Sequence, residues 1–175
     1  MVCDIINSDR KGFVKGDGAM GRAKRYIRCL AYLIGIGIIS FAAGRSLPQK
    51  WVTPDKFPFC SFAFERGGKL YDKLKIKKWK DKLPDMSRLC RRIMPAKRCA
   101  GRRQSLPVLI RETCIAEWSH LKLILAGFYC KKIVPDITGH IISLVYAVGN
   151  LPFIMVQRYN RPRLIRSAAR AGHGT

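Results

Sequence analysis

The strongest constraint on this chain is an uncharged run near its carboxyl end. Residues 137–157, ITGHIISLVYAVGNLPFIMVQ, contain no Lys, Arg, Asp or Glu. At about 1.5 Å per residue, a helix of this length reaches about 30 Å, which is the thickness of the hydrocarbon core of a bilayer. The run therefore predicts a membrane-spanning helix.

The flanks and interior of this span carry further information. Pro152 removes a backbone donor and predicts a kink, and Asn150 needs a hydrogen-bond partner from another helix. A cluster of arginine residues after the span is typical of the cytoplasmic face of a membrane. These residues are Arg158, Arg161, Arg163, Arg166 and Arg170.

The charge balance implies an anionic partner. The 175 residues include 34 Lys and Arg against 11 Asp and Glu, a net charge of +23. Nucleic acid, phospholipid headgroups and a polyphosphate such as coenzyme A are the candidates, and the uncharged run disfavours nucleic acid. The seven cysteines are odd in number and form no C-x-x-C pair, so neither a zinc site nor a disulfide framework is indicated, and no metal is expected.

The first 44 residues divide into two parts. Residues 1–25 are predicted to be a mobile basic tail, and residues 26–44 an apolar membrane segment. A basic leader, an apolar stretch and an Ala-Ala-Gly end fit a signal peptide, but the long leader favours slightly an uncleaved anchor. The glycine and alanine residues of this segment permit close packing against another helix.

Residues 45–108 are predicted to be a basic, aromatic segment at the membrane interface. Gly67 and Gly68 break the chain before residues 69–82, KLYDKLKIKKWKDK, where two apolar lines at helical spacing predict an amphipathic helix on an anionic membrane, ended by Pro84. A solvated basic helix with a short packed face is an equally weighted alternative. Residues 87–104 are basic and contain no nucleotide-binding fingerprint.

Residues 109–164 are predicted to form a transmembrane hairpin, followed by a basic tail at 165–175. Residues 109–134 would lie against 137–157, with both outer ends at the cytoplasmic side. Lys131 and Lys132 at the tip conflict with that orientation, as does the basic leader of the first span, so the topology stays open. The fold class is all-α: a small integral membrane protein with a C-terminal helical hairpin, an N-terminal apolar helix and a basic interfacial helix.

One short sequence carries residues suited to chemistry. On a helix, Cys114, Glu117 and His120 share a face, so Glu117 would orient the ring of His120, which would act as general base. A structural hydrogen bond between Glu117 and His120 is the alternative interpretation. Arg158, Asn160 and Arg161 are candidates to stabilise an oxyanion. The chain has no G-x-S-x-G, H-E-x-x-H or H-x-x-x-x-D motif.

Three blocks together resemble a known family. They are KIKKWKDKLP at 75–84, ETCIAEWSH at 112–120, and NLP at 150–152 with QRYNRPRL at 157–164. They are similar to the glycosyl-4,4'-diaponeurosporenoate acyltransferase family, small bacterial membrane proteins of staphyloxanthin-type carotenoid biosynthesis. The resemblance covers residues 64–164, and the last block is the most specific.

The resemblance implies transfer of a fatty acyl group from an acyl thioester to a sugar hydroxyl of a glycosylated carotenoid acid. The donor would be acyl-CoA or an acyl carrier protein thioester, with no bound cofactor. The expected partners are membrane lipid, a glycosylated carotenoid or similar lipid acceptor, and neighbouring biosynthetic enzymes, at the cell membrane. A non-enzymatic basic membrane protein that binds anionic lipid or a partner protein is the alternative. The expected substrate-binding residues are Trp79, Lys80, Glu112, Asn150, Arg158, Asn160, Arg161 and Arg163.

Overall fold

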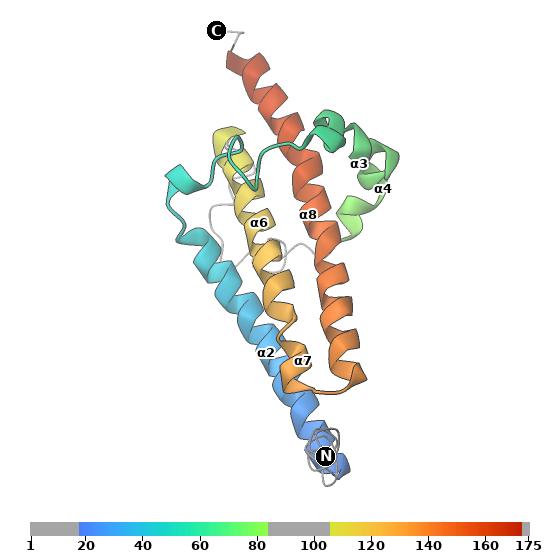
Figure 1. Cartoon of the computed structure of the whole chain (residues 1–175). Helices are drawn as coiled ribbons and strands as arrows, with labels where there is room; N and C mark the ends of the chain where they lie inside the picture. The colour runs from blue at the N-terminus through green and yellow to red at the C-terminus, as the bar shows by residue number, and fades with distance from the viewer. Residues whose placement is uncertain (1–17, 84–105, 173–175) are drawn as a thin grey trace, which may run out of the picture.

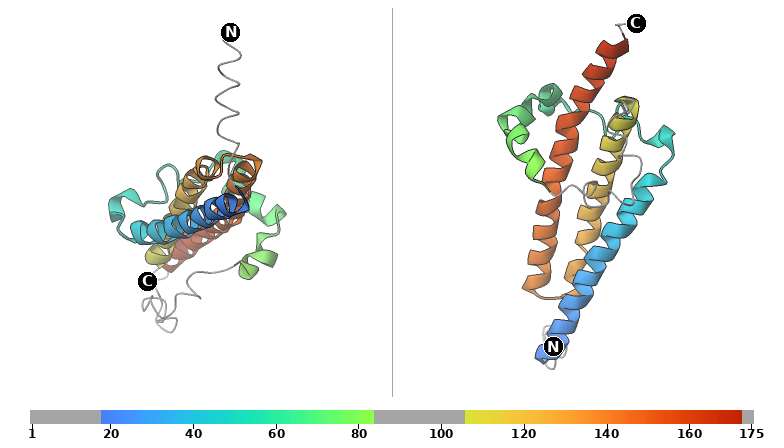
Figure 2. Two further views of the ribbon diagram at one scale, coloured as in Figure 1. Left: turned by 90° about the horizontal axis from the view of Figure 1, so that it is seen from below. Right: turned by 180° about the vertical axis from the view of Figure 1, so that it is seen from behind.

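Three long helices form the body of the protein. The computed structural model describes residues 18–83 and 106–172, and within these ranges every regular element is helical. The long helices are α2 (Ala19–Arg45), α6 (Leu106–Gly127) and α8 (Ile137–Gly172), with the short α7 (Cys130–Ile133) between α6 and α8. Figures 1 and 2 show α2 and α8 running in one direction and α6 in the other. The all-α prediction is confirmed; the expectation for residues 87–104 lies outside the described residues.

The predicted C-terminal hairpin is formed by α6 and α8, which pack along their length. At Gly127 the ring of Tyr146 from α8 packs directly on the backbone of α6, because a Cβ atom there would lie 2.5 Å from Cδ1 of Tyr146. The second arm is longer than the uncharged run, since α8 continues to Gly172 with Pro152 and Pro162 inside it. Each proline removes one intrahelical donor, and packing of α8 against its neighbours sustains the helix across both positions.

The N-terminal helix α2 packs against α6 and α7. The hydroxyl of Tyr32 donates a hydrogen bond of 2.8 Å to the carbonyl oxygen of Ala126, and Cys29 and Cys130 are buried together. α2 begins at Ala19, so the last three basic residues of the stretch that the sequence placed in a tail are helical. These are Arg22, Lys24 and Arg25.

Close packing of α2 depends on one glycine at its end. A Cβ atom at Gly44 would lie 2.8 Å from Oγ of Ser119, whereas Gly35 and Gly37 have nothing within 4 Å of a Cβ position. The prediction that small residues allow close approach therefore holds at Gly44 and not in the middle of the helix.

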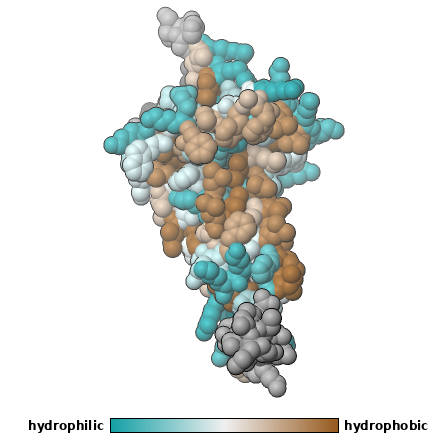
Figure 3. All heavy atoms as spheres, viewed as in Figure 1, coloured by the Kyte–Doolittle hydropathy of each residue, from teal (hydrophilic) through white to brown (hydrophobic). Residues whose placement is uncertain are grey.

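Within the part of the chain that the structure describes, two helices are long and apolar enough to cross a membrane. They are the N-terminal helix over residues 19–44 and the C-terminal helix over residues 137–171, and only 17% and 28% of their most apolar windows are buried inside the protein. The core helix of a soluble protein would be mostly buried, so these exposed apolar faces favour contact with lipid. Figure 3 shows the hydrophobic residues gathered along the length of the bundle, between hydrophilic zones near its two ends.

The segment 46–83 lies at the end of the bundle where α2 ends and α6 begins (Figure 1). Its elements are η1 (Gln49–Trp51), η2 (Ala63–Gly68), α3 (Lys69–Lys73), α4 (Ile76–Trp79) and η3 (Lys80–Lys82). Gly67 and Gly68 have φ angles of 63° and 97°, so the predicted break at these glycines is confirmed. Lys75, with φ of 51°, divides the following stretch, which is two short helices and a 3₁₀ turn rather than the single amphipathic helix expected.

The short helices pack against α8. Ile76 is fully buried in a cluster with Tyr71 and Tyr159, and Arg163 of α8 forms a 2.6 Å ion pair with Asp72. This arrangement matches the alternative interpretation of the sequence, a basic stretch with a short packed face. The packed face of α3 and α4 contacts α8 of the hairpin, and this contact positions the preceding η2 turn beside the site described next.

Candidate active site

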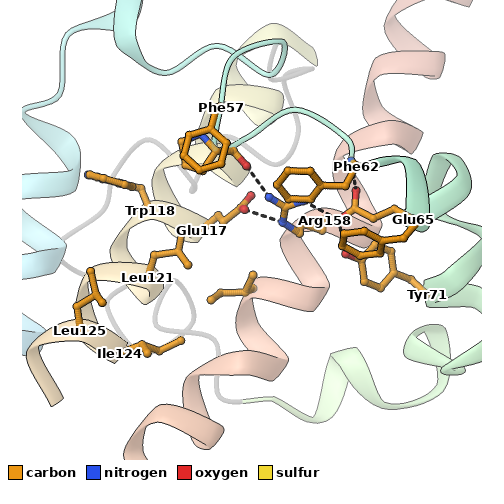
Figure 4. Close-up of a pocket in the computed structure, with 13 residues that line it drawn as sticks. Phe57, Phe62, Glu65, Tyr71, Glu117, Trp118, Leu121, Ile124, Leu125 and Arg158 are labelled. Carbon is orange, nitrogen blue, oxygen red and sulfur yellow. Dashed lines mark hydrogen bonds and ion pairs between the residues drawn. The ribbon is translucent and has the colours of Figure 1, made fainter. Parts of the chain in front are cut away.

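Arg158 is the centre of a buried polar cluster. It lies on α8 and is 9% exposed. Its Nε donates to Oε1 of Glu117 on α6 at 2.7 Å, its Nη1 to Oε1 of Glu65 at 2.6 Å, and its Nη2 to the carbonyl oxygen of Pro58 at 2.5 Å. Figure 4 shows this side chain reaching from α8 toward both carboxylates. All three guanidinium nitrogens therefore already donate a hydrogen bond.

Arg161, three residues further along α8, completes the cluster from the same helix face. It is 3% exposed and donates through Nη2 to Oε2 of Glu117. Its Nε donates to Oγ1 of Thr113 at 3.0 Å, and its Nη1 to the carbonyl oxygen of Phe59 at 2.6 Å. Both oxygens of Glu117, which is fully buried, are thus paired with arginine.

Glu65 supplies the second carboxylate, from the η2 turn. It is 2% exposed, and its Oε1 also accepts a 2.6 Å hydrogen bond from the hydroxyl of Tyr71. Burial alone raises the pKa of the Glu65 carboxyl, but the hydrogen bonds from Tyr71 and Arg158 outweigh it and hold this pKa below its ordinary value. Burial and the bond to Glu65 raise the pKa of Tyr71 above its ordinary range.

The cluster is electrically balanced. Two arginines and two glutamates meet in a buried position, where an unpaired charge would be strongly unfavourable. Because the partners come from α6, α8 and the segment 46–83, the cluster fixes that segment against the hairpin. The cluster as a whole was not predicted. The sequence indicated Glu117 and both arginines as site residues, but not Glu65, Tyr71 or Thr113.

An apolar groove of about 450 Å³ ends on this cluster. Its apolar wall comes from the aromatic residues of the segment 46–83, one face of α6, and Ile154 of α8, and four residues of the cluster form its polar end (Figure 4). The aromatic and α6 residues are Phe57, Phe62, Phe64, Trp118, Leu121, Ile124 and Leu125, and the polar end consists of Glu65, Tyr71, Glu117 and Arg158.

A second, smaller cavity lies on the other side of Arg158. Its volume is about 220 Å³, and it shares Glu65 and Arg158 with the groove. Along α8 the groove contacts Ile154, whereas the smaller cavity contacts residues 161–166, nearer the carboxyl end of the helix. The smaller cavity is the more polar of the two: Ser61, Arg161 and Arg166 join the two shared residues in its wall.

His120 lies deeper in the hairpin and its partner differs from the one expected. Its Nδ1 is 2.8 Å from Oδ1 of Asn150, and its ring stacks on Phe153 with centroids 4.7 Å apart. The prediction that Asn150 has a partner on another helix is therefore confirmed. The prediction that Glu117 orients the ring of His120 is wrong, because both oxygens of Glu117 are held by arginines on the neighbouring helix.

The remaining predicted residues do not join the groove. Trp79 and Lys80 lie at the end of the α4 region, where the Lys80 ammonium is 5.6 Å from the ring centroid of Tyr159, and Arg163 stacks on the same ring at 3.6 Å. Glu112 and Asn160 are partly exposed and contact neither cavity. Among residues 18–83 and 106–172, no group of three or more His, Cys, Asp or Glu side chains is placed to hold a metal ion.

The fold and site define a small helical protein with two apolar candidate membrane spans and an apolar groove that ends on buried charged groups. The chain belongs to the glycosyl-4,4'-diaponeurosporenoate acyltransferase family, whose profile matches residues 48–170. The resemblance drawn from the three sequence blocks is thus confirmed.

Relatives carrying this name occur in Staphylococcus aureus. The protein of the bovine strain is 32% identical over 151 residues, which covers 83% of this chain and 91% of the relative. That of strain MRSA252 is 32% identical over 147 residues, 81% of this chain and 88% of the relative. No solved structure matches this chain.

Proposed function

We propose that this protein transfers a fatty acyl group from an acyl thioester to a sugar hydroxyl of a glycosylated carotenoid acid within a membrane. The observation that carries the proposal is the apolar groove of about 450 Å³ that ends on Glu65, Glu117 and Arg158. Its volume lies in the usual range for small-molecule sites, and apolar walls with a few convergent polar groups are typical of them. The names of the curated relatives supply the reaction type.

The groove suits the hydrocarbon part of a substrate. Its α6 wall includes Leu121, Ile124 and Leu125, and Leu125 is 72% exposed, so a chain dissolved in the bilayer has a route into it. The opposite end presents fixed charges, where a polar reacting group would be held. An acyl chain or a polyene therefore lies in the groove with its carbonyl or sugar near Arg158.

The reaction exchanges one acyl bond for another. The sugar oxygen attacks the thioester carbonyl carbon, the carbon–sulfur bond breaks, and the hydroxyl proton passes through a base to the departing thiolate. The products are an acylated sugar and a free thiol. Neither a metal nor a bound cofactor is needed for this balance.

His120 is the proposed base, and its hydrogen bonds indicate which nitrogen would act. Nδ2 of Asn150 donates to the carbonyl oxygen of Tyr146 at 2.8 Å, so Oδ1 of Asn150 is the acceptor facing His120. A neutral ring must then carry its proton on Nδ1, which leaves the lone pair on Nε2 to accept the hydroxyl proton. Asn150 takes the orienting role that the sequence gave to Glu117.

The position of His120 sets a condition on this mechanism. The ring is not in the groove wall, but Leu121 next to it and Ile154 beside its stacking partner Phe153 both are. The acceptor hydroxyl must therefore reach the ring between α6 and α8 at this wall. Each of their nitrogens already donates, so Arg158 and Arg161 would stabilise an oxyanion through N–H groups of Nη1 and Nη2 that these bonds leave over, because a guanidinium carries five N–H donors.

The charge distribution supports a membrane orientation. Ten Lys and Arg residues of the segment 46–83 and five arginines of α8 lie at one end of the bundle, against six basic residues at the other end. By the positive-inside rule, the end with the segment 46–83 faces the cytoplasm, where acyl-CoA and acyl carrier protein are made. The six at the opposite end are Arg22, Lys24, Arg25, Arg28, Lys131 and Lys132.

The test is acyl transfer in membranes that contain the protein, supplied with labelled long-chain acyl-CoA and a glycosylated carotenoid acid, followed by chromatography of the lipids. His120→Ala is compared with His140→Ala, a matched change at an exposed histidine of the same hairpin. An acylated glycoside from the parent and from His140→Ala, with at least a hundredfold loss in His120→Ala, supports both reaction and base. Equal product from both variants rules out the base, and no product from any folded form rules out the reaction with these substrates.

A further inference from the structure

We propose that the smaller cavity binds the phosphate-bearing arm of the acyl donor, with Arg166 as its anionic contact. The inference rests on the proposed acyl transfer and names the donor's place in it. Its basis is the position of two cavities of different polarity that share one charged pair, Glu65 and Arg158.

The order of contacts along α8 gives the two cavities a direction. Ile154 contacts the groove, Arg158 contacts both cavities, and Arg166 contacts the smaller cavity. At 1.5 Å per residue, these twelve positions extend about 18 Å along the helix, from the apolar length of the bundle toward its basic end. A ligand that follows this direction changes from an apolar to a polar environment at Arg158.

An acyl thioester on a phosphopantetheine arm has the same order of parts. Its hydrocarbon chain fits the apolar groove, its reacting carbonyl falls at the junction, and its amide-containing arm with phosphates continues into the more polar cavity. Coenzyme A and acyl carrier protein both carry this arm, and either satisfies the chemistry of the cavity. A glycosylated carotenoid has an apolar and a polar part as well, but its sugar bears no anionic group for the arginines of the cavity to recognise.

Arg166 is the arginine of the smaller cavity that is best placed to receive a phosphate. Arg158 and Arg161 are buried, and their nitrogens already donate to carboxylates, carbonyl oxygens and Thr113. Arg166 is exposed at the rim, and its hydrogen bond to the carbonyl oxygen of Gly67 is long, at 3.4 Å. A guanidinium in this position can turn to a phosphate and make charge-assisted, bidentate contacts without disturbing the buried cluster.

The experiment measures steady-state kinetics of the full chain in membranes with two donors. One is a long-chain acyl-CoA, and the other carries the same acyl group on N-acetylcysteamine, which has the thioester and one amide but no phosphate. Arg166→Gln is compared with Arg170→Gln, which removes the same charge from an exposed position one turn further along α8. Replacing acyl-CoA by an acyl carrier protein thioester identifies the preferred carrier.

We expect Arg166→Gln to raise KM for acyl-CoA about tenfold, with kcat within about twofold, because the contact is made equally in the ground and transition states. The same variant should leave KM for the N-acetylcysteamine donor unchanged, and Arg170→Gln should behave as the parent with both. Equal effects of the two substitutions, equal effects on the two donors, or a rise confined to KM for the carotenoid acceptor would each overturn the assignment.

Equilibrium binding separates this inference from the proposed function. Labelled acyl-CoA is bound to the purified parent, Arg166→Gln and Arg170→Gln proteins in detergent, without an acceptor. About tenfold weaker binding to Arg166→Gln alone supports the cavity assignment even where no transfer occurs, and identical binding to all three overturns it. Loss of transfer with normal, Arg166-dependent donor binding counts against the carotenoid acceptor and not against the donor site.

Discussion

Removing the charge of Glu117 is the most direct test of the buried cluster. Glu117→Gln keeps the size of the side chain but leaves Arg158 and Arg161 with one carboxylate, Glu65, in a position that is less than a tenth exposed. Breaking one side of a buried ion pair typically costs about 3–5 kcal/mol of unfolding free energy, because the remaining charge stays buried without compensation. For a chain of this size, that loss corresponds to a fall of roughly 6–20 °C in Tm.

The chain offers a matched control on the same helix. Asp72 pairs with Arg163 of α8 at 2.6 Å, but the two side chains are 57% and 32% exposed. An exposed pair contributes about 0–1 kcal/mol, so Asp72→Asn should lower Tm by no more than about 4 °C. Both substitutions change a carboxylate into its amide and remove one partner of an α8 arginine, so the comparison isolates burial.

Thermal unfolding in detergent can be followed with a dye that fluoresces on reaction with thiols. Cys114, which is fully buried one turn before Glu117 on α6, is one of three buried free cysteines among the described residues, with Cys29 and Cys130, so the dye signal includes exposure of the site. Similar Tm values for Glu117→Gln and Asp72→Asn, both within about 4 °C of the parent, would refute the argument that the buried cluster holds the segment 46–83 against the hairpin.

Three further outcomes are expected. Gly127→Ala should lose about 1–3 kcal/mol of stability, because its Cβ would lie 2.5 Å from the ring of Tyr146, whereas Gly35→Ala, with nothing within 4 Å, should be neutral in the same thermal assay. The pKa of Glu65 is lower in the folded state than its ordinary value of 4.5. The ionised carboxylate therefore stabilises the fold fully above that pH, and this stabilisation is lost as the pH falls below it. In Glu65→Gln, Tm should consequently depend less on pH below 4.5 than in the parent. If the basic end of the bundle faces the cytoplasm, as proposed, a green fluorescent reporter fused after the last residue should fluoresce and an alkaline phosphatase fusion there should be inactive; the reverse pattern would invert the orientation.

The fold was predictable where the local sequence alone determines structure. The uncharged run at 137–157 and the break at Gly67 and Gly68 are local signals, and both correspond to features of the structure. The continuation of α8 to Gly172 was not predictable in this way, because RYNRPRL contains a proline and four charged or polar side chains that normally mark the end of a span. The helix persists there because Arg158 and Arg161 are paired by partners from α6 and the segment 46–83.

The candidate site shows the same division between local and non-local information. The i, i+3 spacing correctly placed Glu117 and His120 on one helix, but it did not determine which partner each side chain would choose across the hairpin. One signal for Glu65 was present in the sequence: in a chain with only 11 acidic residues, this carboxylate follows three closely spaced aromatic residues at 59, 62 and 64. A lone acid among side chains that become buried requires a cationic partner, and arginines were the available cations after the span.

In the proposed mechanism, substrate binding and proton transfer belong to different parts of the hairpin, because Glu117 and His120 do not contact each other as partners. The Arg158 cluster is buried and electrically balanced, which suits a wall that would position the junction of an amphipathic substrate. Among the described residues, the hydrogen-bond partner of His120 is the neutral Asn150, which is bonded to Nδ1 and leaves the other ring nitrogen to exchange a proton in the proposed reaction. In the proposed mechanism, the charged wall would hold the substrate, and His120, one helical turn further along α6, would activate the hydroxyl.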